Sequence, residues 1–68
     1  MSNVAKIIEV IGSSDKSWEA AADAAVQTAS ETVSGIHSIQ VQSMTGRVED
    51  GKIVKFKTTL KLSFGVRD

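Results

Sequence analysis

Two long runs of alternating apolar and polar residues flank Asp50-Gly51, and they constrain the fold of this chain more than any other feature. The first run reads GIHSIQVQSMTGRV (residues 35–48) and the second reads KIVKFKTTLKLSF (residues 52–64). Alternation with a period of two is the pattern of a strand that buries one face. Asp-Gly between two such runs predicts a tight hairpin, because a type I′ turn needs a positive φ at two successive residues.

Closing the hairpin at Asp50-Gly51 also predicts its register. Gln42 should lie opposite Thr59, and Met44 opposite Lys57. One face of the hairpin should then be apolar and receive a helix: Ile39, Val41, Leu60 and Leu62. The other face of the first run is short or uncharged, where a solvent-facing strand usually carries Lys and Glu: Ser38, Gln40 and Gln42. This pattern predicts that the polar face contacts something other than bulk water.

The first half of the chain predicts one strand and one helix. VAKIIEVIG (residues 4–12) is rich in β-branched residues and ends in Gly, as strands often do. SSDKSWEAAADAAVQTASETVSG (residues 13–35) predicts a helix with Ser14 as its N-cap and Gly35 as its stop. Its apolar arc is mostly Ala, with Trp18 as an anchor in the core: Trp18, Ala22, Ala25, Val26, Ala29 and Val33. The opposite stripe is polar: Glu19, Asp23, Gln27 and Glu31.

The order β-α-β-β predicts an α+β fold in which a three-stranded antiparallel sheet wraps around one amphipathic helix. We expect residues 1–68 to form a single domain. A chain of 68 residues buries only about 60% of its unfolded surface, and there is no Cys to form a disulfide. Long strand edges invite pairing with other chains. We therefore expect a homo-oligomer without a stable folded monomer.

The charge balance limits the classes of partner. Eight basic and eight acidic side chains give no net charge, so bulk attraction to nucleic acid or to anionic lipid is not expected. The row Lys55, Lys57 and Lys61 has no interleaved aromatic residues for stacking bases. The N-terminus lacks a signal-peptide pattern, and no apolar run reaches membrane-spanning length. A cytoplasmic protein without a membrane or nucleic-acid partner is the expectation.

The residue types also argue against an enzyme. The chain has one His, no Cys and no Tyr. His37 lies where the chain enters the second strand and needs no catalytic role there. The acidic residues Glu19 and Asp23 are candidate ligands for Ca²⁺ or Mg²⁺ if several copies bring them together, because these ions prefer clustered oxygens. A solvated helix face is the alternative interpretation.

Three segments of the chain resemble the dodecins: KIIEVIGSSDKSWEAAADAAVQTASETV, VQSMTGRVEDGKI and FKTTLKLSF. The resemblance covers essentially the whole chain. It implies a βαββ fold assembled as a hollow sphere of twelve subunits, which binds and stores a flavin (FMN, FAD, riboflavin or a degradation product) without catalysis.

The resemblance also implies a ligand site on the polar face of the hairpin, between subunits. In flavin-binding members a Trp on the second strand stacks on the flavin ring and a Gln on the third strand hydrogen-bonds its polar edge. Those positions are Ser38 and Lys57 here, and Gln40 and Met44 are the other site positions implied. Ser38 has no aromatic face, and Lys57 can donate but not accept. The alternative is therefore a flavin-free structural or cation-binding assembly, as proposed for members that lack the stacking Trp.

Overall fold

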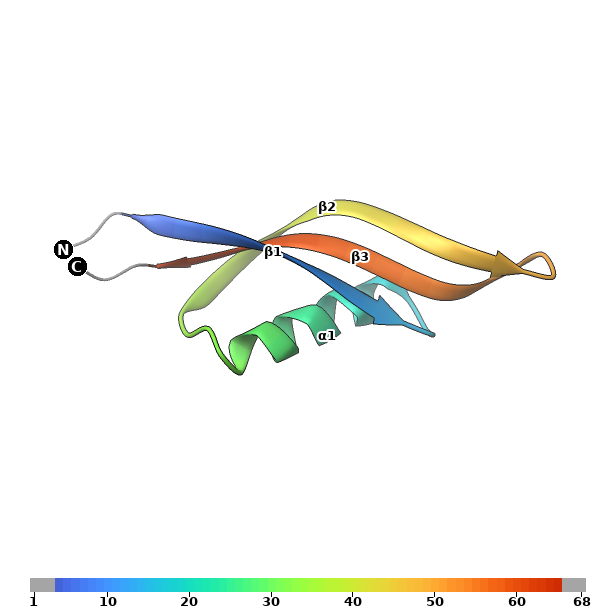
Figure 1. The fold of residues 1–68 in the computed structure, drawn as a ribbon, viewed down its shortest axis with the longest axis horizontal. Coiled ribbons are helices and arrows are strands. Elements are labelled where there is room, and N and C mark those ends of the chain that lie inside the picture. Colours follow the sequence, from blue (N-terminus) through green and yellow to red (C-terminus); the bar gives the residue numbers. More distant parts are fainter. Residues whose placement is uncertain (1–3, 66–68) are drawn as a thin grey trace.

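Three antiparallel strands and one helix make up residues 4–65, the part of the chain that the computed structural model describes. Their order is β1 (Ala5–Ser14), α1 (Trp18–Ser30), β2 (Ile36–Glu49) and β3 (Lys52–Gly65). The strands are arranged β1-β3-β2, so the last strand is the central one. The helix lies across one face of this sheet (Figure 1). The predicted fold class, α+β with β-α-β-β order, is confirmed.

The helix packs on β1 and β3 through small residues. Ala21 and Ala25 are buried, and a side chain at Gly12 in β1 would overlap the carbonyl oxygen of Ala21. The core is formed by Ala25, Leu60 and Leu62, with partly buried apolar residues around it: Ile8, Val10, Ala22, Val26, Ala29 and Ile36. The predicted Ala-rich arc is thus the packing face of the helix, although Ala21 belongs to it as well.

The predicted hairpin turn is also confirmed. Asp50 has φ 52° and Gly51 has φ 76°, the two successive positive values that a type I′ turn requires. Strands β2 and β3 each have 14 residues. The turn end of this hairpin projects beyond the helix (Figure 1).

The predicted register of the hairpin is wrong between two bulges. Thr59 lies opposite Ser43 rather than Gln42, and Lys57 lies opposite Thr45 rather than Met44. The reason is that the register shifts once between Arg47 and Val48 and again between Val41 and Ser43. Counting from the turn, the first shift leaves Val54 on β3 without a partner, and the second leaves Gln42 on β2 without one. The two shifts cancel, so beyond them the predicted pairs of Ile39 with Leu62 and of Val41 with Leu60 are found.

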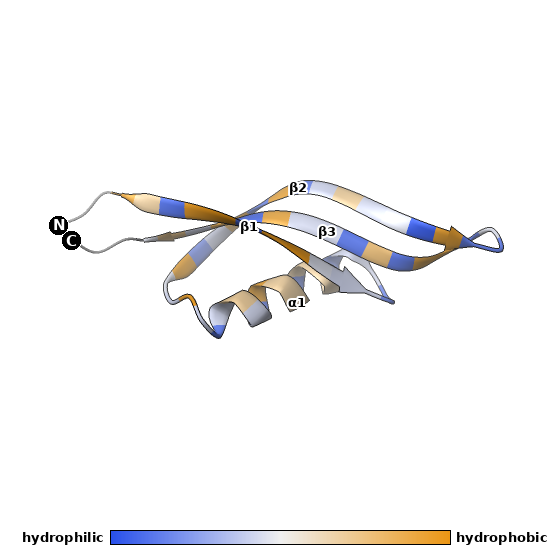
Figure 2. Cartoon of the chain, in the orientation of Figure 1, coloured by the Kyte–Doolittle hydropathy of each residue, from blue (hydrophilic) through white to orange (hydrophobic). Residues whose placement is uncertain are grey.

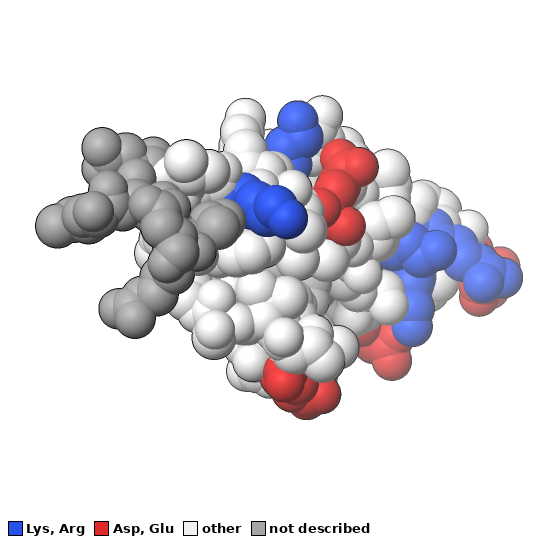
Figure 3. Space-filling model, turned by 60° about the vertical axis from the view of Figure 1, so that its left-hand side comes forward, with Lys and Arg blue, Asp and Glu red and all other residues white. Residues whose placement is uncertain are grey.

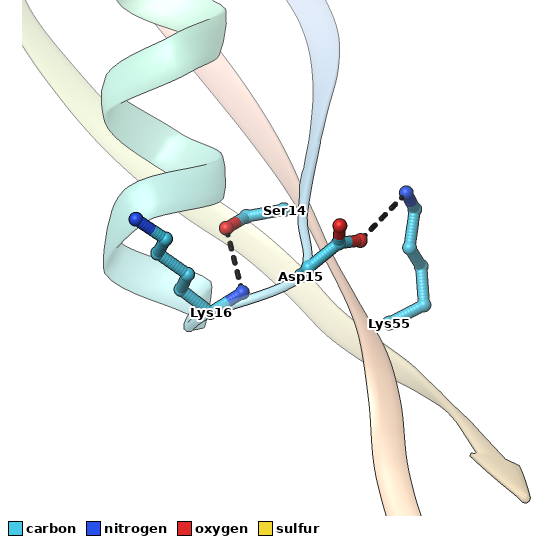
Figure 4. Close-up of polar contacts among 4 residues, drawn as sticks. All are labelled: Ser14, Asp15, Lys16 and Lys55. Atoms are coloured by element: carbon cyan, nitrogen blue, oxygen red, sulfur yellow. Dashed lines mark hydrogen bonds and ion pairs between the residues drawn. The ribbon is translucent and has the colours of Figure 1, made fainter.

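The predicted helix boundaries were too wide at both ends. Ser14 is the last residue of β1, where it pairs with Phe56, and the N-cap is Ser17, whose Oγ accepts from Ala20 N at 2.9 Å. Ser14 Oγ instead accepts from Lys16 N at 2.9 Å in the connecting loop (Figure 4). Strand β1 continues past Gly12 because Ser13 and Ser14 pair with Lys57 and Phe56 of the long β3.

At its other end the helix stops at Ser30, with Glu31 as the C-cap. Gly35 is not the residue that ends the helix. It has φ 79° and lies just before β2, where a left-handed residue redirects the chain.

Trp18 has the packing role that the sequence predicts, at the start of the helix. Its ring meets Phe56 edge to face, with centroids 4.8 Å apart, and its Nε1 donates to Thr45 O at 2.8 Å. Thr58 Oγ1 donates to the carbonyl oxygen of Trp18 at 2.9 Å. The indole is half-buried rather than enclosed, and it connects α1 to both strands of the hairpin.

Strand β2 is left largely uncovered by the helix. Ile39 and Val41 pair with the buried Leu62 and Leu60, yet they remain 45% and 47% exposed. The predicted single apolar face therefore receives the helix only over β3. Figure 2 shows strongly apolar stretches in β1 beside polar ones, whereas polar and apolar residues alternate along the hairpin.

The molecule is extended for its size. It measures 54 × 20 × 12 Å with a radius of gyration of 14.1 Å, against about 11 Å for a compact chain of this length. Its accessible surface is 5102 Å², against about 4100 Å² for a folded monomer of this mass. Among residues 4–65, the single helix is too short to cross a membrane.

Candidate functional site

The face of the sheet opposite the helix, here called the outer face, carries the candidate site. Directly paired residues of an antiparallel sheet point to the same side. Thr58, Leu60 and Leu62 face the helix, so their odd-numbered neighbours on β3 point away from it. The outer face of the hairpin therefore consists of these pairs: Ser38–Ser63, Gln40–Lys61, Ser43–Thr59, Thr45–Lys57 and Arg47–Lys55.

Two zones divide this outer face. Toward the start of β2 lies a zone of short or uncharged hydrogen-bonding residues on β2, here called the neutral zone: Ser38, Gln40 and Ser43, with Ser63, Lys61 and Thr59 opposite on β3. Toward the turn lies a cavity of about 450 Å³, here called the basic cavity, lined by Thr45, Gly46, Arg47, Val54, Lys55 and Lys57. Lys and Arg side chains gather toward this end of the hairpin in Figure 3.

The three cations of the basic cavity differ in their partners. Lys55 Nζ lies 3.0 Å from Asp15 Oδ1, which ties the loop after β1 to β3 (Figure 4). Arg47 lies 3.0 Å from the Glu49 carboxylate, and both of these side chains are well exposed. Exposed ion pairs contribute at most about 1 kcal/mol, so neither carboxylate is held tightly. Within residues 4–65, the Lys57 side chain has no hydrogen bond or ion pair.

The structure separates two residues that the resemblance assigns to one ligand. Ser38 and Lys57 both lie on the outer face, but Ser38 pairs with Ser63, six residues from Lys57 along β3. At about 3.3 Å per residue the two sites are about 20 Å apart. One chain therefore does not bring them together, and a ligand touching both positions needs two copies of the chain.

The other two implied site residues lie on opposite sides of the sheet. Gln40 is on the outer face, next to Ser38 in the neutral zone. Met44 pairs with Thr58, which bonds the helix, so Met44 lies on the helix side. This differs from the predicted position opposite Lys57, and the register shift between Arg47 and Val48 is the reason.

The candidate metal ligands Glu19 and Asp23 lie one turn apart on the exposed side of α1. Within residues 4–65, no group of three or more His, Cys, Asp or Glu side chains could hold a metal ion. A cation site at these two carboxylates would thus need oxygens from further copies.

Sequence reasoning missed Thr45 and Arg47 as residues of the outer face. An uninterrupted alternation from the turn places Arg47 opposite Val54, on the helix side. The bulges place it opposite Lys55 instead. The sequence held a signal for each bulge. Two polar residues, Gln42 and Ser43, interrupt the alternation between Val41 and Met44, and Gly46 lies next to the shift at Arg47.

The family model for dodecin matches residues 4–67. The chain belongs to the dodecin family. Dodecins are small binding proteins, and members of the family form homo-oligomers. The predicted family membership is confirmed.

Individual relatives agree over nearly the whole length. A curated protein named calcium dodecin, from Mycobacterium tuberculosis, is 35% identical over 65 residues, which is 96% of this chain and 92% of that protein. The solved dodecin of Streptomyces coelicolor has a TM-score of 0.90 and 32% identity, covering 100% of this chain and 99% of that one. The solved calcium dodecin of M. tuberculosis, described as calcium-chelating with a novel calcium-binding site, has a TM-score of 0.80 and 39% identity, covering 96% and 93%.

Proposed function

We propose that this protein is a non-catalytic, cytoplasmic dodecin that binds and stores a flavin-type small molecule as a homododecamer of single-domain chains. The observation that carries the proposal is the outer face of the hairpin. There the neutral zone adjoins the basic cavity, and no helix or strand of residues 4–65 covers either of them.

The neutral zone has the chemistry that the edge of a flavin ring requires. The ring edge presents both hydrogen-bond donors and acceptors, and the Gln40 amide and the Ser38 hydroxyl can each donate and accept. Short side chains leave room for a flat ring against the sheet. Because Ser38 cannot stack, the contribution of about 1–3 kcal/mol that an aromatic partner makes to ring binding is missing. We therefore expect weaker binding than in a dodecin with a Trp at this position.

Assembly is part of this function, because one chain offers only half of the site. Ser38 and Lys57 are too far apart to share a ligand within a chain. The extended shape and the exposed Ile39 and Val41 give each chain apolar surface that another copy can cover.

The test is the absorption spectrum of the purified protein, followed by a titration that monitors flavin fluorescence. We expect quenching that saturates on addition of FMN, and a loss of affinity in Gln40→Leu, which keeps the size of the side chain and removes its hydrogen bonds. Glu31→Leu on the exposed helix end is the matched control. Absence of flavin absorption together with no quenching at millimolar FMN would rule the flavin proposal out.

Binding of a divalent cation is the second candidate function, supported by the calcium dodecin relative. Glu19 and Asp23 are the candidate ligands, and several copies would have to bring them together. Calorimetric titration with CaCl₂ should then show binding that Glu19→Gln and Asp23→Asn abolish. Glu9→Gln on β1 is the control that should leave it unchanged. If both helix variants still bind calcium, Glu19 and Asp23 are not the ligands and the calcium site lies elsewhere in the assembly.

A further inference from the structure

We propose that Trp18 is a positioning residue that holds the middle of the hairpin one residue out of the register that the rest of the hairpin follows. Through this register it determines which side chains of β2 reach the outer face. This role depends on the geometry of the hairpin alone and does not rest on the ligand proposed above.

The displaced part of the hairpin is short and has one common register on both sides. Near the turn Val48 pairs with Ile53, and a regular hairpin continued from this pair would place Val41 opposite Leu60, as observed. Only the pairs between them deviate from this regular register, each by one residue. They are here called the shifted segment: Ser43–Thr59, Met44–Thr58, Thr45–Lys57, Gly46–Phe56 and Arg47–Lys55. The segment can therefore adopt the regular register without a change in the turn or in the far part of the hairpin.

The shift needs a stabilising contact. Each bulge interrupts the ladder of hydrogen bonds and leaves one residue unpaired, Val54 on β3 and Gln42 on β2. Strand β1 does not impose the shift on β3, because all 10 residues of β1 pair with β3 in one unbroken register. The shift therefore belongs to β2, which requires a contact outside the sheet to hold it.

Trp18 supplies this contact, and it reaches both strands within the shifted segment. Its Nε1 donates to Thr45 O at 2.8 Å, which is the only hydrogen bond between the helix and β2 within residues 4–65. Its ring meets Phe56 edge to face, and its carbonyl oxygen accepts from Thr58 Oγ1. One residue thus fixes β2 and β3 relative to each other at the displaced pairs.

Gly46 explains why the ring selects this register. It lies opposite Phe56 on the helix side, where a Cβ would already be 3.6 Å from Trp18 Cζ2 and 3.3 Å from Ile53 Cγ2. In the regular register Thr45 would take this place, and the branches of its side chain would have to share the space with the indole. The shift instead places the only Gly of β2 against the ring.

Without Trp18 the shifted segment should return to the regular register. Met44 would then turn to the outer face, opposite Lys57, whereas Thr45 and Arg47 would turn to the helix side. A one-residue change of register exchanges the two faces of a strand. The composition of the outer face therefore depends on a residue that lies on the other side of the sheet.

Pairs of engineered cysteines report the register in the intact assembly. The chain has no Cys, and a disulfide forms only between residues that face each other at close range. Thr45→Cys with Lys57→Cys marks the observed register, and Met44→Cys with Lys57→Cys marks the regular register. Gln40→Cys with Lys61→Cys marks a pair common to both registers and shows that the hairpin is folded. Mass spectrometry of the oxidised chain quantifies each bridge.

We expect the protein with Trp18 in place to form the bridge of the observed register and the common bridge, but not the bridge of the regular register. In Trp18→Leu the yield of the regular-register bridge should rise about tenfold or more, the change that loss of one good hydrogen bond makes to an equilibrium between two registers. Val26→Ala is the control, because it removes core packing outside the shifted segment, and it should keep the parent pattern.

The common bridge separates a change of register from unfolding. A parent-like pattern in Trp18→Leu with the common bridge intact would overturn the proposed role, and so would a regular-register bridge in the parent or in Val26→Ala. If Trp18→Leu does not form the common bridge, its hairpin is unfolded. Trp18→Phe, which keeps a ring but has no N–H, then decides by the same criterion.

Discussion

Gly12 sets the distance between helix and sheet, because the Ala21 carbonyl occupies the place that a side chain at Gly12 would take. Gly12→Ala should destabilise the protein by at least about 1–3 kcal/mol, the usual cost of inserting a methyl group into a packed core. Gly65→Ala is the control, because nothing lies within 4 Å of the side chain it would add. Chemical denaturation measures the unfolding free energy of both variants. Equal midpoints would show that the helix can move away from β1 without cost.

Ser38 is the residue at which an aromatic side chain should strengthen the flavin site. Ser38→Trp places an indole on the outer face, where Ser38 and the facing Ser63 leave room for it. We expect flavin affinity to rise about tenfold, which corresponds to about 1.4 kcal/mol. Ser30→Trp, at the exposed end of α1, adds the same group away from the site and should change nothing. A titration of flavin fluorescence that gives the same affinity for both variants would contradict this assignment.

At the scale of elements, the start of the helix depends on Ser17 rather than on Ser14. Ser17 Oγ accepts from Ala20 N, whereas the bond from Lys16 N to Ser14 Oγ lies within an exposed loop. Ser17→Ala should therefore cost about 1 kcal/mol of unfolding free energy. Ser14→Ala should cost clearly less. Thermal unfolding monitored by circular dichroism compares the stabilities of the two variants. A larger loss of stability in Ser14→Ala than in Ser17→Ala would indicate that Ser14 is the N-cap.

At the scale of the whole molecule, the uncovered part of β2 should be an interface between copies. Val41 pairs with a buried residue of β3 but remains 47% exposed in the single chain. In a monomer, Val41→Lys would change stability by no more than about 0.5 kcal/mol, as for most surface substitutions. In an assembly that buries Val41, the charge should prevent association.

Light scattering of the parent and of Val41→Lys distinguishes these cases. We expect twelve times the 7.2 kDa chain mass for the parent and a smaller, unfolded species for the variant. Ser30→Lys on the exposed helix end is the control and should assemble normally. A well-folded monomeric parent at micromolar concentration would contradict the proposed assembly.

The sequence by itself determined the order of the elements, the position of the hairpin turn and the Ala-rich packing face of the helix. These features depend on local chemistry: the period of apolar residues, the tolerance of Asp50-Gly51 for positive φ, and small side chains at helical spacing. Family membership could be recognised for the same reason, because it rests on these segments.

Only the tertiary structure decided which residues share the outer face. The alternation along β2 skips a residue at Gln42-Ser43, but only the pairing with β3 shows that the register shifts, and the shift at Arg47 places Met44 on the helix side and Arg47 on the outer face. The tertiary structure also decided that Ser38 and Lys57 lie too far apart to meet in one chain. The physical reason is that register is a property of two paired strands, so it depends on how β2 and β3 fit over Trp18 and the helix, which neither strand encodes alone.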